Sequence, residues 1–275
     1  MKPPRFDYFA PQSSAEALAA LAEEGGEAFI LAGGQSLLPL LTMRLARPRL
    51  LIDIMRIEEW REIRLEGGAI RIGAGVRQAE LESFPGLARH QPLLALALPF
   101  VGHPQTRSRG TVCGSIAFAD PSAELPLALL ALEGQVHLRS RQRARSLAAA
   151  DFFTGTMASA RAEDEVIEAV SFPVAGEGCG YAFREVTRRG GDFAIAAFAA
   201  FVDERSARLG VGGVADRPFL RFMPRPGTKD LDEALDAFAF DLEAREDLHA
   251  SARYRRELVR RLGRLALEEA ERCRA

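Results

Sequence analysis

Two short glycine-rich turns, about eighty residues apart, constrain this chain more than any other feature. The first, L-A-G-G-Q-S at 31–36, joins a short apolar run to the apolar segment 37–45. The second, R-G-T-V-C-G-S, occupies 109–115. One glycine suffices for a tight turn, because glycine reaches positive φ without steric cost. Two adjacent glycines, followed by a hydroxyl residue and a helix start, also suit a site where backbone N–H groups converge on an anion.

The two turns match neither of the common phosphate-binding motifs. The chain contains no G-x-x-x-x-G-K-[ST] loop, and neither turn reads G-x-G-x-x-G, so ATP hydrolysis and a Rossmann fold lose support. Each turn still supplies glycine for close backbone approach and a hydroxyl donor, Ser36 in the first and Thr111 and Ser115 in the second. Together they would clamp the pyrophosphate of a dinucleotide from both sides. The alternative is that both are ordinary tight turns.

Composition indicates an ordinary globular protein. With 275 residues, 48% of them hydrophobic, the chain can form one large or two modest domains. Its formal charge of −2 gives no general attraction to nucleic acid or anionic membrane. No segment approaches the roughly 20 apolar residues of a membrane span, and residues 1–7 lack the apolar region of a secretory signal. We therefore expect a cytoplasmic protein with no membrane span.

The cysteines and histidines predict no metal site in this chain. The three cysteines, Cys113, Cys179 and Cys273, are widely separated and form no C-x-x-C pair. The four histidines show no i, i+4 spacing. The basic run 253–264 fits a solvated helix paired with nearby glutamates, or a contact with a partner subunit, better than an RNA-binding surface.

Hydrophobic periodicity and capping signals predict alternating strands and helices in the first two thirds of the chain. Ser13 and Glu16 form a capping-box pattern, so a helix should run to about Glu24 and end at Gly25. An Asp-Pro pair at 120–121 marks another helix start. Strands are predicted at 28–31, 50–54, 69–74, 135–140 and 166–172, helices at 37–45, 76–84, 92–101 and 120–132, and a helical or irregular segment at 146–156.

The pattern changes after a glycine-rich linker at 173–180. Strands are predicted at 181–187, 193–202, 208–214 and 219–222, followed by helices at 230–242 and 251–271. Strands first and helices afterwards indicate an α+β domain with a meander sheet.

Two long segments resemble a known family. Residues 32–54, beginning A-G-G-Q-S-L-L-P-L-L-T-M-R-L, and residues 102–126, G-H-P-Q-T-R-S-R-G-T-V-C-G-S-I-A-F-A-D-P-S-A-E-L-P, resemble the FAD-binding (medium) subunit of the molybdenum hydroxylases. This is the carbon monoxide dehydrogenase/xanthine dehydrogenase flavoprotein family. The resemblance continues in R-R-x-x-D-F-A within 181–197 and in S-A-R-Y-R-R at 251–256, so it spans nearly the whole chain.

The resemblance implies a fold and a set of cofactor-binding residues. The fold would be a vanillyl-alcohol-oxidase-like (PCMH-type) FAD-binding domain at 1–175, made of two α/β subdomains at about 1–55 and 56–175, and a C-terminal α+β domain at 176–275. Asp120 and Glu124 would approach the ribitol or adenosine part of FAD, and Arg184 or a neighbour would lie near the cofactor. The residues that would line the diphosphate are Ala32, Gly33, Gly34, Gln35, Ser36, Gly110, Thr111, Val112, Cys113, Gly114 and Ser115.

Two positions depart from the family pattern. Cys113 stands where the family commonly has glycine, which would narrow the turn if φ is positive there. A single cysteine beside a cofactor is more often a small packing residue than a redox group. Phe118 stands where many members have histidine, which suggests a different wall near the flavin.

The resemblance also implies a division of labour among subunits. A large subunit would oxidise the substrate at a molybdenum–pterin centre, and two [2Fe–2S] clusters on a small subunit would pass electrons to FAD in this chain. FAD would then reduce NAD, oxygen or a quinone-linked carrier, and the complex would be a dimer of heterotrimers. No general acid or base is assigned here, and the substrate would be chosen by the large subunit.

Two other functions stay open. One is a self-contained flavin oxidoreductase of the same fold, which would need a catalytic Ser, Glu or His in a substrate pocket. The other is a non-catalytic assembly subunit that has lost FAD, although the intact glycines of both turns argue against it.

Overall fold

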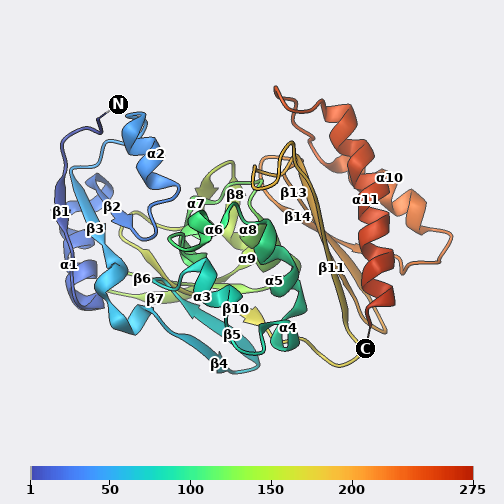
Figure 1. Ribbon diagram of the computed structural model, residues 1–275, viewed down its shortest axis with the longest axis horizontal. Helices are drawn as coiled ribbons and strands as arrows, with labels where there is room; N and C mark the ends of the chain where they lie inside the picture. Colours follow the sequence, from blue (N-terminus) through green and yellow to red (C-terminus); the bar gives the residue numbers. More distant parts are fainter. Residues whose placement is uncertain (1, 275) are drawn as a thin grey trace.

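In the computed structural model, which describes residues 2–274, three larger sheets lie one after another along the long axis (Figure 1). The first is parallel, with β1 (Asp7–Phe9), β3 (Leu50–Asp53) and β2 (Ala28–Leu31) in that order. The second is antiparallel, in the order β4 (Ile63–Glu66), β5 (Ala69–Gly73), β10 (Val166–Pro173), β6 (Gln135–Arg139) and β7 (Ala144–Ala148). The third is the antiparallel meander β11 (Gly180–Val186), β12 (Ala196–Val202), β13 (Ala207–Gly212) and β14 (Phe219–Met223).

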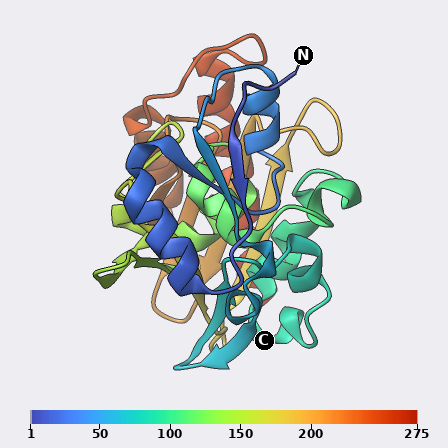
Figure 2. The ribbon, with the colours of Figure 1, turned by 90° about the vertical axis from the view of Figure 1, so that its left-hand side faces the viewer.

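The parallel sheet carries α1 (Ser14–Glu24) on its outer side, where it faces the viewer in Figure 2. Ser13 caps this helix as predicted, because its Oγ accepts from the Glu16 N–H at 3.3 Å. The Glu16 carboxylate accepts instead from the N–H of Gln12, one residue before the cap. Gly25 ends the helix with φ +57°, and α2 (Leu37–Thr42) then joins β2 to β3.

Short helices pack against the five-stranded sheet: α3 (Gln78–Glu82), α4 (Leu87–His90), α5 (Pro92–Ala97), α6 (Pro104–Arg107), α7 (Val112–Phe118), α8 (Glu124–Ala131) and α9 (Ala149–Phe152). Every residue of α8 is buried, as expected for a helix that is apolar on all sides. It lies between the middle of the molecule and the meander, where it contacts β12 and β13 (Figure 1).

Several predicted boundaries were wrong for local reasons. The helix expected from Asp120 begins at Glu124, because the Asp120 carboxylate accepts from the Ser122 N–H at 2.8 Å and closes a separate turn. The helix expected at 92–101 ends at Ala97 and tightens into a 3-10 turn at 98–100 that contains Pro99. The segment 146–156 contains the end of β7, then α9 and β8 (Phe153–Gly155), which pairs with β9 (Ala158–Ser159).

The C-terminal part confirms the predicted meander sheet and its two helices. α10 (Leu231–Asp241) and α11 (Ala252–Arg272) cover the outer face of the sheet (Figure 1). A β-carbon on Gly180 would lie 1.8 Å from the carbonyl oxygen of Ala270, so glycine permits this close approach of β11 to α11. The buried Arg255 guanidinium donates to the Gly213 carbonyl at 2.6 Å and pairs with Asp247 at 2.6 Å, which ties α11 to the end of β13.

Membrane-spanning helices are absent from residues 2–274, where no helix is long and apolar enough to cross a bilayer.

Candidate functional site

The two glycine-rich turns touch each other. A β-carbon on Gly33 would lie 2.2 Å from the carbonyl oxygen of Arg109 and 2.6 Å from Cα of Gly110. These distances are far below van der Waals contact, so any side chain at 33 would push the turns apart. Glycine at this position is therefore required by the approach of two chain segments, which an isolated tight turn would not require.

The first turn presents free backbone donors. Gly34 has φ +73°, and its carbonyl accepts from the Leu38 N–H at 3.0 Å to begin α2. The N–H groups of Gly34, Gln35 and Ser36 donate to no acceptor within residues 2–274, and the Ser36 hydroxyl does not cap the helix. Free N–H groups at the start of a helix favour an anion.

The second turn is held firmly in place. The Gly110 carbonyl accepts from the Gln78 N–H at 2.8 Å, and the Val112 N–H donates to the Val76 carbonyl at 3.1 Å. The Thr111 Oγ1 caps α7 by accepting from the Gly114 N–H at 3.0 Å. Its hydroxyl hydrogen stays available for a further acceptor.

A cavity of about 750 Å³ extends from this junction in both directions. The glycine turns form its middle, which Ala32, Gly33, Gly34, Gln35, Ser36, Gly110, Thr111, Cys113, Gly114 and Ser115 line. At one end lie Gly26, Phe29, Arg161, Glu163 and Glu165, and at the other lie Phe118, Asp120, Glu124 and Gly191–Phe193. The volume falls in the range of small-molecule and cofactor sites.

The meander domain contributes to this cavity through the loop before β12. Gly191 has φ +85°, and a β-carbon there would lie 2.4 Å from Cε1 of His103. Phe193 lines the cavity and is 66% exposed. Two segments that resemble the same family, 102–126 and 181–197, thus lie against each other at this end.

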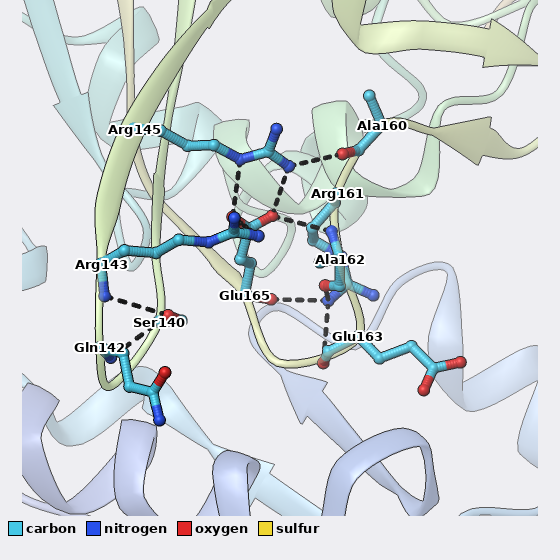
Figure 3. Close-up of polar contacts among 9 residues, drawn as sticks. All are labelled: Ser140, Gln142, Arg143, Arg145, Ala160, Arg161, Ala162, Glu163 and Glu165. Carbon is cyan, nitrogen blue, oxygen red and sulfur yellow. Dashed lines mark hydrogen bonds and ion pairs between the residues drawn. The ribbon is translucent and has the colours of Figure 1, made fainter.

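A buried acid anchors the opposite end of the cavity (Figure 3). Glu165 is fully buried, and its carboxylate accepts from Arg145 Nε at 2.7 Å, Arg145 Nη2 at 2.8 Å and the Ala162 N–H at 2.8 Å. Arg143 Nη2 lies 3.2 Å away. These cations and hydrogen bonds, led by Arg145, lower the pKa of Glu165, so this acid is ionised.

The same cluster orders Arg161, a cation in the cavity wall. Arg161 Nη1 donates to the Glu165 carbonyl at 2.6 Å and to the Ala162 carbonyl at 2.9 Å (Figure 3). Burial lowers the pKa of Arg161, although an arginine stays charged in a protein. The turn 160–165 is thereby fixed against the hairpin of β6 and β7.

Glu124, at the end of the cavity that Phe118 also lines, has a different environment. It lies at the start of α8, is nearly fully buried and forms no ion pair within residues 2–274. Burial raises the pKa of Glu124 to about 7. This acid is therefore partly protonated near neutral pH.

The structure resolves the question about Cys113. The residue lies inside α7 and its φ is not positive, so it does not narrow the turn. Its side chain is buried, and burial raises the pKa of the Cys113 thiol to about 12. A thiol that stays protonated is a poor nucleophile, which agrees with a packing role.

Two of the predicted site residues lie away from the cavity. The Val112 side chain is fully buried in the core. Arg184, on β11, pairs with Glu269 of α11 at 2.8 Å and does not line the cavity. The reason is strand alternation, because Arg184 points to the face of the meander that α11 covers.

Sequence reasoning also missed part of the wall. The turn 161–167, Phe29 and Gln78 line the cavity without belonging to a recognised motif. Glu165 and Arg145 are twenty residues apart, so no local pattern reveals their pairing.

Comparisons with known proteins agree on one family. Residues 4–175 match the model described as the FAD binding domain in molybdopterin dehydrogenase. The chain is 38% identical over 283 residues to the 6-hydroxypseudooxynicotine dehydrogenase complex subunit alpha of Paenarthrobacter nicotinovorans, covering 98% of this chain and 96% of that protein. It is 36% identical over 282 residues to the carbon monoxide dehydrogenase medium chain of Hydrogenophaga pseudoflava, covering 98% of each.

Solved structures give the same result. A chain of carbon monoxide dehydrogenase from Hydrogenophaga pseudoflava superposes with a TM-score of 0.95 and 35% identity over all of both chains. A chain of quinoline 2-oxidoreductase from Pseudomonas putida 86 gives a TM-score of 0.90 and 32% identity over 99% of each chain. The predicted α+β FAD-binding fold with a C-terminal antiparallel sheet is thus confirmed.

Proposed function

This chain belongs to the family of FAD-binding medium subunits of the molybdenum hydroxylases, and from that premise we propose that it binds FAD across its two glycine turns. It is an oxidoreductase subunit of a multi-subunit molybdenum dehydrogenase. The proposal extends to its partners: a small subunit with two [2Fe–2S] clusters would deliver electrons to FAD, and a large subunit with the molybdopterin cofactor would oxidise the substrate. Two such heterotrimers would form the complex.

The contact between Gly33 and the segment 109–110 carries the proposal. It brings the first turn, with its free N–H groups, against the second turn, and residues of both turns, Thr111 among them, line one cavity. Backbone donors and hydroxyls in this arrangement suit a diphosphate. The cavity continues on both sides of the junction, which gives each half of a dinucleotide a separate compartment.

The residues of this chain bind, orient and shield the cofactor. The turns would hold the diphosphate, the 161–167 segment would border one half of FAD, and Phe118, Asp120, Glu124 and Phe193 would border the other. FAD itself would supply the redox chemistry, and the protein would set its position and surroundings. The loop 191–193 would limit the access of water from the meander side.

The names of the relatives support the expectation that this subunit does not choose the substrate. Proteins named for 6-hydroxypseudooxynicotine and for carbon monoxide resemble the chain at 38% and 36% identity. Subunits of enzymes named for chemically different compounds thus resemble this chain to nearly the same degree. We propose that the large partner subunit determines which compound is oxidised.

The test is an absorption spectrum of the full chain, purified alone and with its co-purifying subunits, followed by chromatography of the acid-released cofactor. The proposal predicts released FAD from the chain and iron–sulfur absorption only when partners are present. A chain that stays colourless and cannot be reconstituted with FAD would overturn the proposal in favour of an assembly subunit. Turnover by the chain alone would favour a self-contained flavoenzyme.

A further inference from the structure

Among the residues that the structure describes, 2–274, one cation lines the cavity, and it lies at the end that contains Glu165. Arg161 is the only lysine, arginine or histidine of that lining. Five acids share the lining with it: Asp120, Glu124, Glu163, Glu165 and Asp192. A diphosphate brings further negative charge into these surroundings, and the glycine turns offer it N–H groups and hydroxyls without a formal charge. Arg161 is therefore the lining side chain whose charge is opposite to that of the ligand.

The position of Arg161 is fixed by its own turn (Figure 3). Its Nη1 donates to the carbonyl oxygens of Glu165 at 2.6 Å and of Ala162 at 2.9 Å. The turn itself is held by Arg145, whose Nη2 donates to the Ala160 carbonyl at 2.8 Å and to the Glu165 carboxylate at 2.8 Å. Because one nitrogen of Arg161 is already bound to the protein, a ligand that binds the other nitrogens has less side-chain entropy to remove.

Two nitrogens of Arg161 remain free for a ligand. Within residues 2–274, its Nε and Nη2 donate to no acceptor, and the side chain forms no salt bridge. The acid at the centre of the cluster, Glu165, is already bound by Arg145, which uses its own Nε and Nη2. These two nitrogens form the edge of a guanidinium that binds carboxylates and phosphates with two parallel hydrogen bonds. The corresponding edge of Arg161 is thus available to a ligand in the cavity.

The other end of the cavity suits the flavin half of FAD better than this end does. Phe193 lines that end and is 66% exposed, so it reaches the protein surface, where a flavin can exchange electrons with other proteins. The acids there have no cation beside them among the lining residues of 2–274. The end with Arg161 has the buried Glu165 and its arginines in its wall, and it suits the half of FAD that is bound without reacting.

We propose that Arg161 binds the adenosine monophosphate (AMP) half of FAD and thereby makes the cavity selective for FAD over flavin mononucleotide (FMN). The inference rests on the proposed function, because it takes a flavin dinucleotide as the ligand of the cavity. FMN shares the flavin, the ribitol and one phosphate with FAD but lacks the AMP half. It can therefore occupy the glycine turns and the end lined by Phe193 without contacting Arg161.

The two flavins should respond differently to the loss of this cation. Arg161→Gln removes the charge and keeps a polar side chain. Loss of a charge-assisted hydrogen bond should raise the dissociation constant for FAD by about tenfold to a hundredfold, whereas the constant for FMN should change by less than about twofold. Arg161→Lys retains the charge without the planar pair of donors, so its affinity for FAD should lie between those of the wild type and Arg161→Gln.

The experiment is a titration of the apoprotein of the full chain with FAD and, separately, with FMN, followed by flavin fluorescence. Arg139→Gln is the matched control, because Arg139 pairs with Glu168 at 3.5 Å on the same sheet and does not line the cavity. This variant loses the same charge and should keep the wild-type affinity for both flavins. Thermal unfolding of each variant shows whether it is folded at the temperature of the titration.

Three results would overturn the role of Arg161. The first is an affinity for FAD that is unchanged in Arg161→Gln. The second is an equal loss of FAD and FMN affinity, because it would show that the substitution disturbs the whole cavity. The third needs no variant: equal wild-type affinities for FAD and FMN would show that the AMP half contributes nothing. A wild-type apoprotein that binds neither flavin would instead overturn the proposed function.

Discussion

Buried acids at the two ends of the cavity have pKa values shifted in opposite directions. At one end, Glu165 is fully buried but surrounded by Arg145, Arg143 and a backbone donor, so its pKa is lowered. At the other end, Glu124 is buried without a cation among residues 2–274, and burial raises its pKa to about 7. Outside the cavity lining, burial also raises the pKa of the partly buried Glu185 of β11, to about 8. Burial alone therefore does not determine the charge of these walls. Glu165, at the end with ion pairs, stays ionised and holds the turn 160–165 in place, whereas the protonation of Glu124, at the other end, changes near neutral pH.

The largest expected effect comes from breaking the paired end. Glu165→Ala leaves Arg145 and Arg143 without their common partner and releases the turn 160–165. The free energy of unfolding should therefore fall by about 3 kcal/mol. Chemical denaturation of the apoprotein measures this loss. Glu163→Ala is the control, because Glu163 lies in the same turn without an ion pair within residues 2–274 and should change stability by less than about 0.5 kcal/mol.

The next effect is expected at the contact between the two glycine turns, which lies between the two ends of the cavity. Gly33→Ala places a methyl group against Arg109 and Gly110, so the turns must separate at a cost of about 1–3 kcal/mol. If the separated turns lose their contacts with the diphosphate, the dissociation constant for FAD should rise by about ten- to a hundredfold. Fluorescence titration measures the change, with Gly190→Ala as the control, since nothing lies within 4 Å of a β-carbon there. Equal affinities of the two variants would show that the turns do not cooperate.

A third prediction concerns the sign of the pH dependence of stability. The pKa values of Glu124 and Glu185 are higher in the folded chain than the value of about 4.3 in an unfolded chain, so their contribution is greatest below about pH 4 and is lost as pH rises toward 8. The lowered pKa of Glu165 acts in reverse, and its contribution is lost as pH falls below about 4. Denaturation midpoints from pH 5 to pH 8 should therefore fall less in Glu185→Gln than in the wild-type apoprotein. A steeper fall in the variant would contradict the assignment of the unpaired acids.

The smallest expected effect tests the cap of the second turn. Thr111→Ala removes the acceptor for the Gly114 N–H and should cost about 1 kcal/mol, whereas Thr111→Ser retains the hydroxyl and should cost less. Both ends of the cavity should keep their pH behaviour, because the cap touches neither acid cluster. Thermal unfolding of the two variants makes the comparison, and identical losses would show that the methyl group, and not the hydroxyl, is important.

Local signals in the sequence predicted the local structure well. The Ser13 cap, the strand at 28–31 and the meander were confirmed, because each depends on neighbouring residues or on simple alternation. Helix boundaries were less accurate where a side chain closes a separate turn, as Asp120 does. The two glycine turns were recognisable, although their contact appears only in three dimensions, where Gly33 meets Arg109.

The acids of the cavity walls could not be assigned from the sequence. Glu165 depends on a partner from another hairpin, and the burial of Glu124 depends on how the elements around α8 pack together. Arg184 or a neighbour was predicted near the cofactor. The alternation of β11 directs Arg184 to Glu269 of α11 and places its neighbour Glu185 on the opposite face of the meander. A pairing across twenty residues, such as that of Arg145 with Glu165, requires the tertiary structure.

We expect one FAD molecule to span both glycine turns and both ends of the cavity. The decisive experiment is hydrogen exchange of the full chain, measured with and without FAD. FAD should slow exchange at 33–36 and 110–115 together, and also at 161–167 and 191–193. If exchange slows at one turn only, or outside the cavity, FAD does not span the two turns.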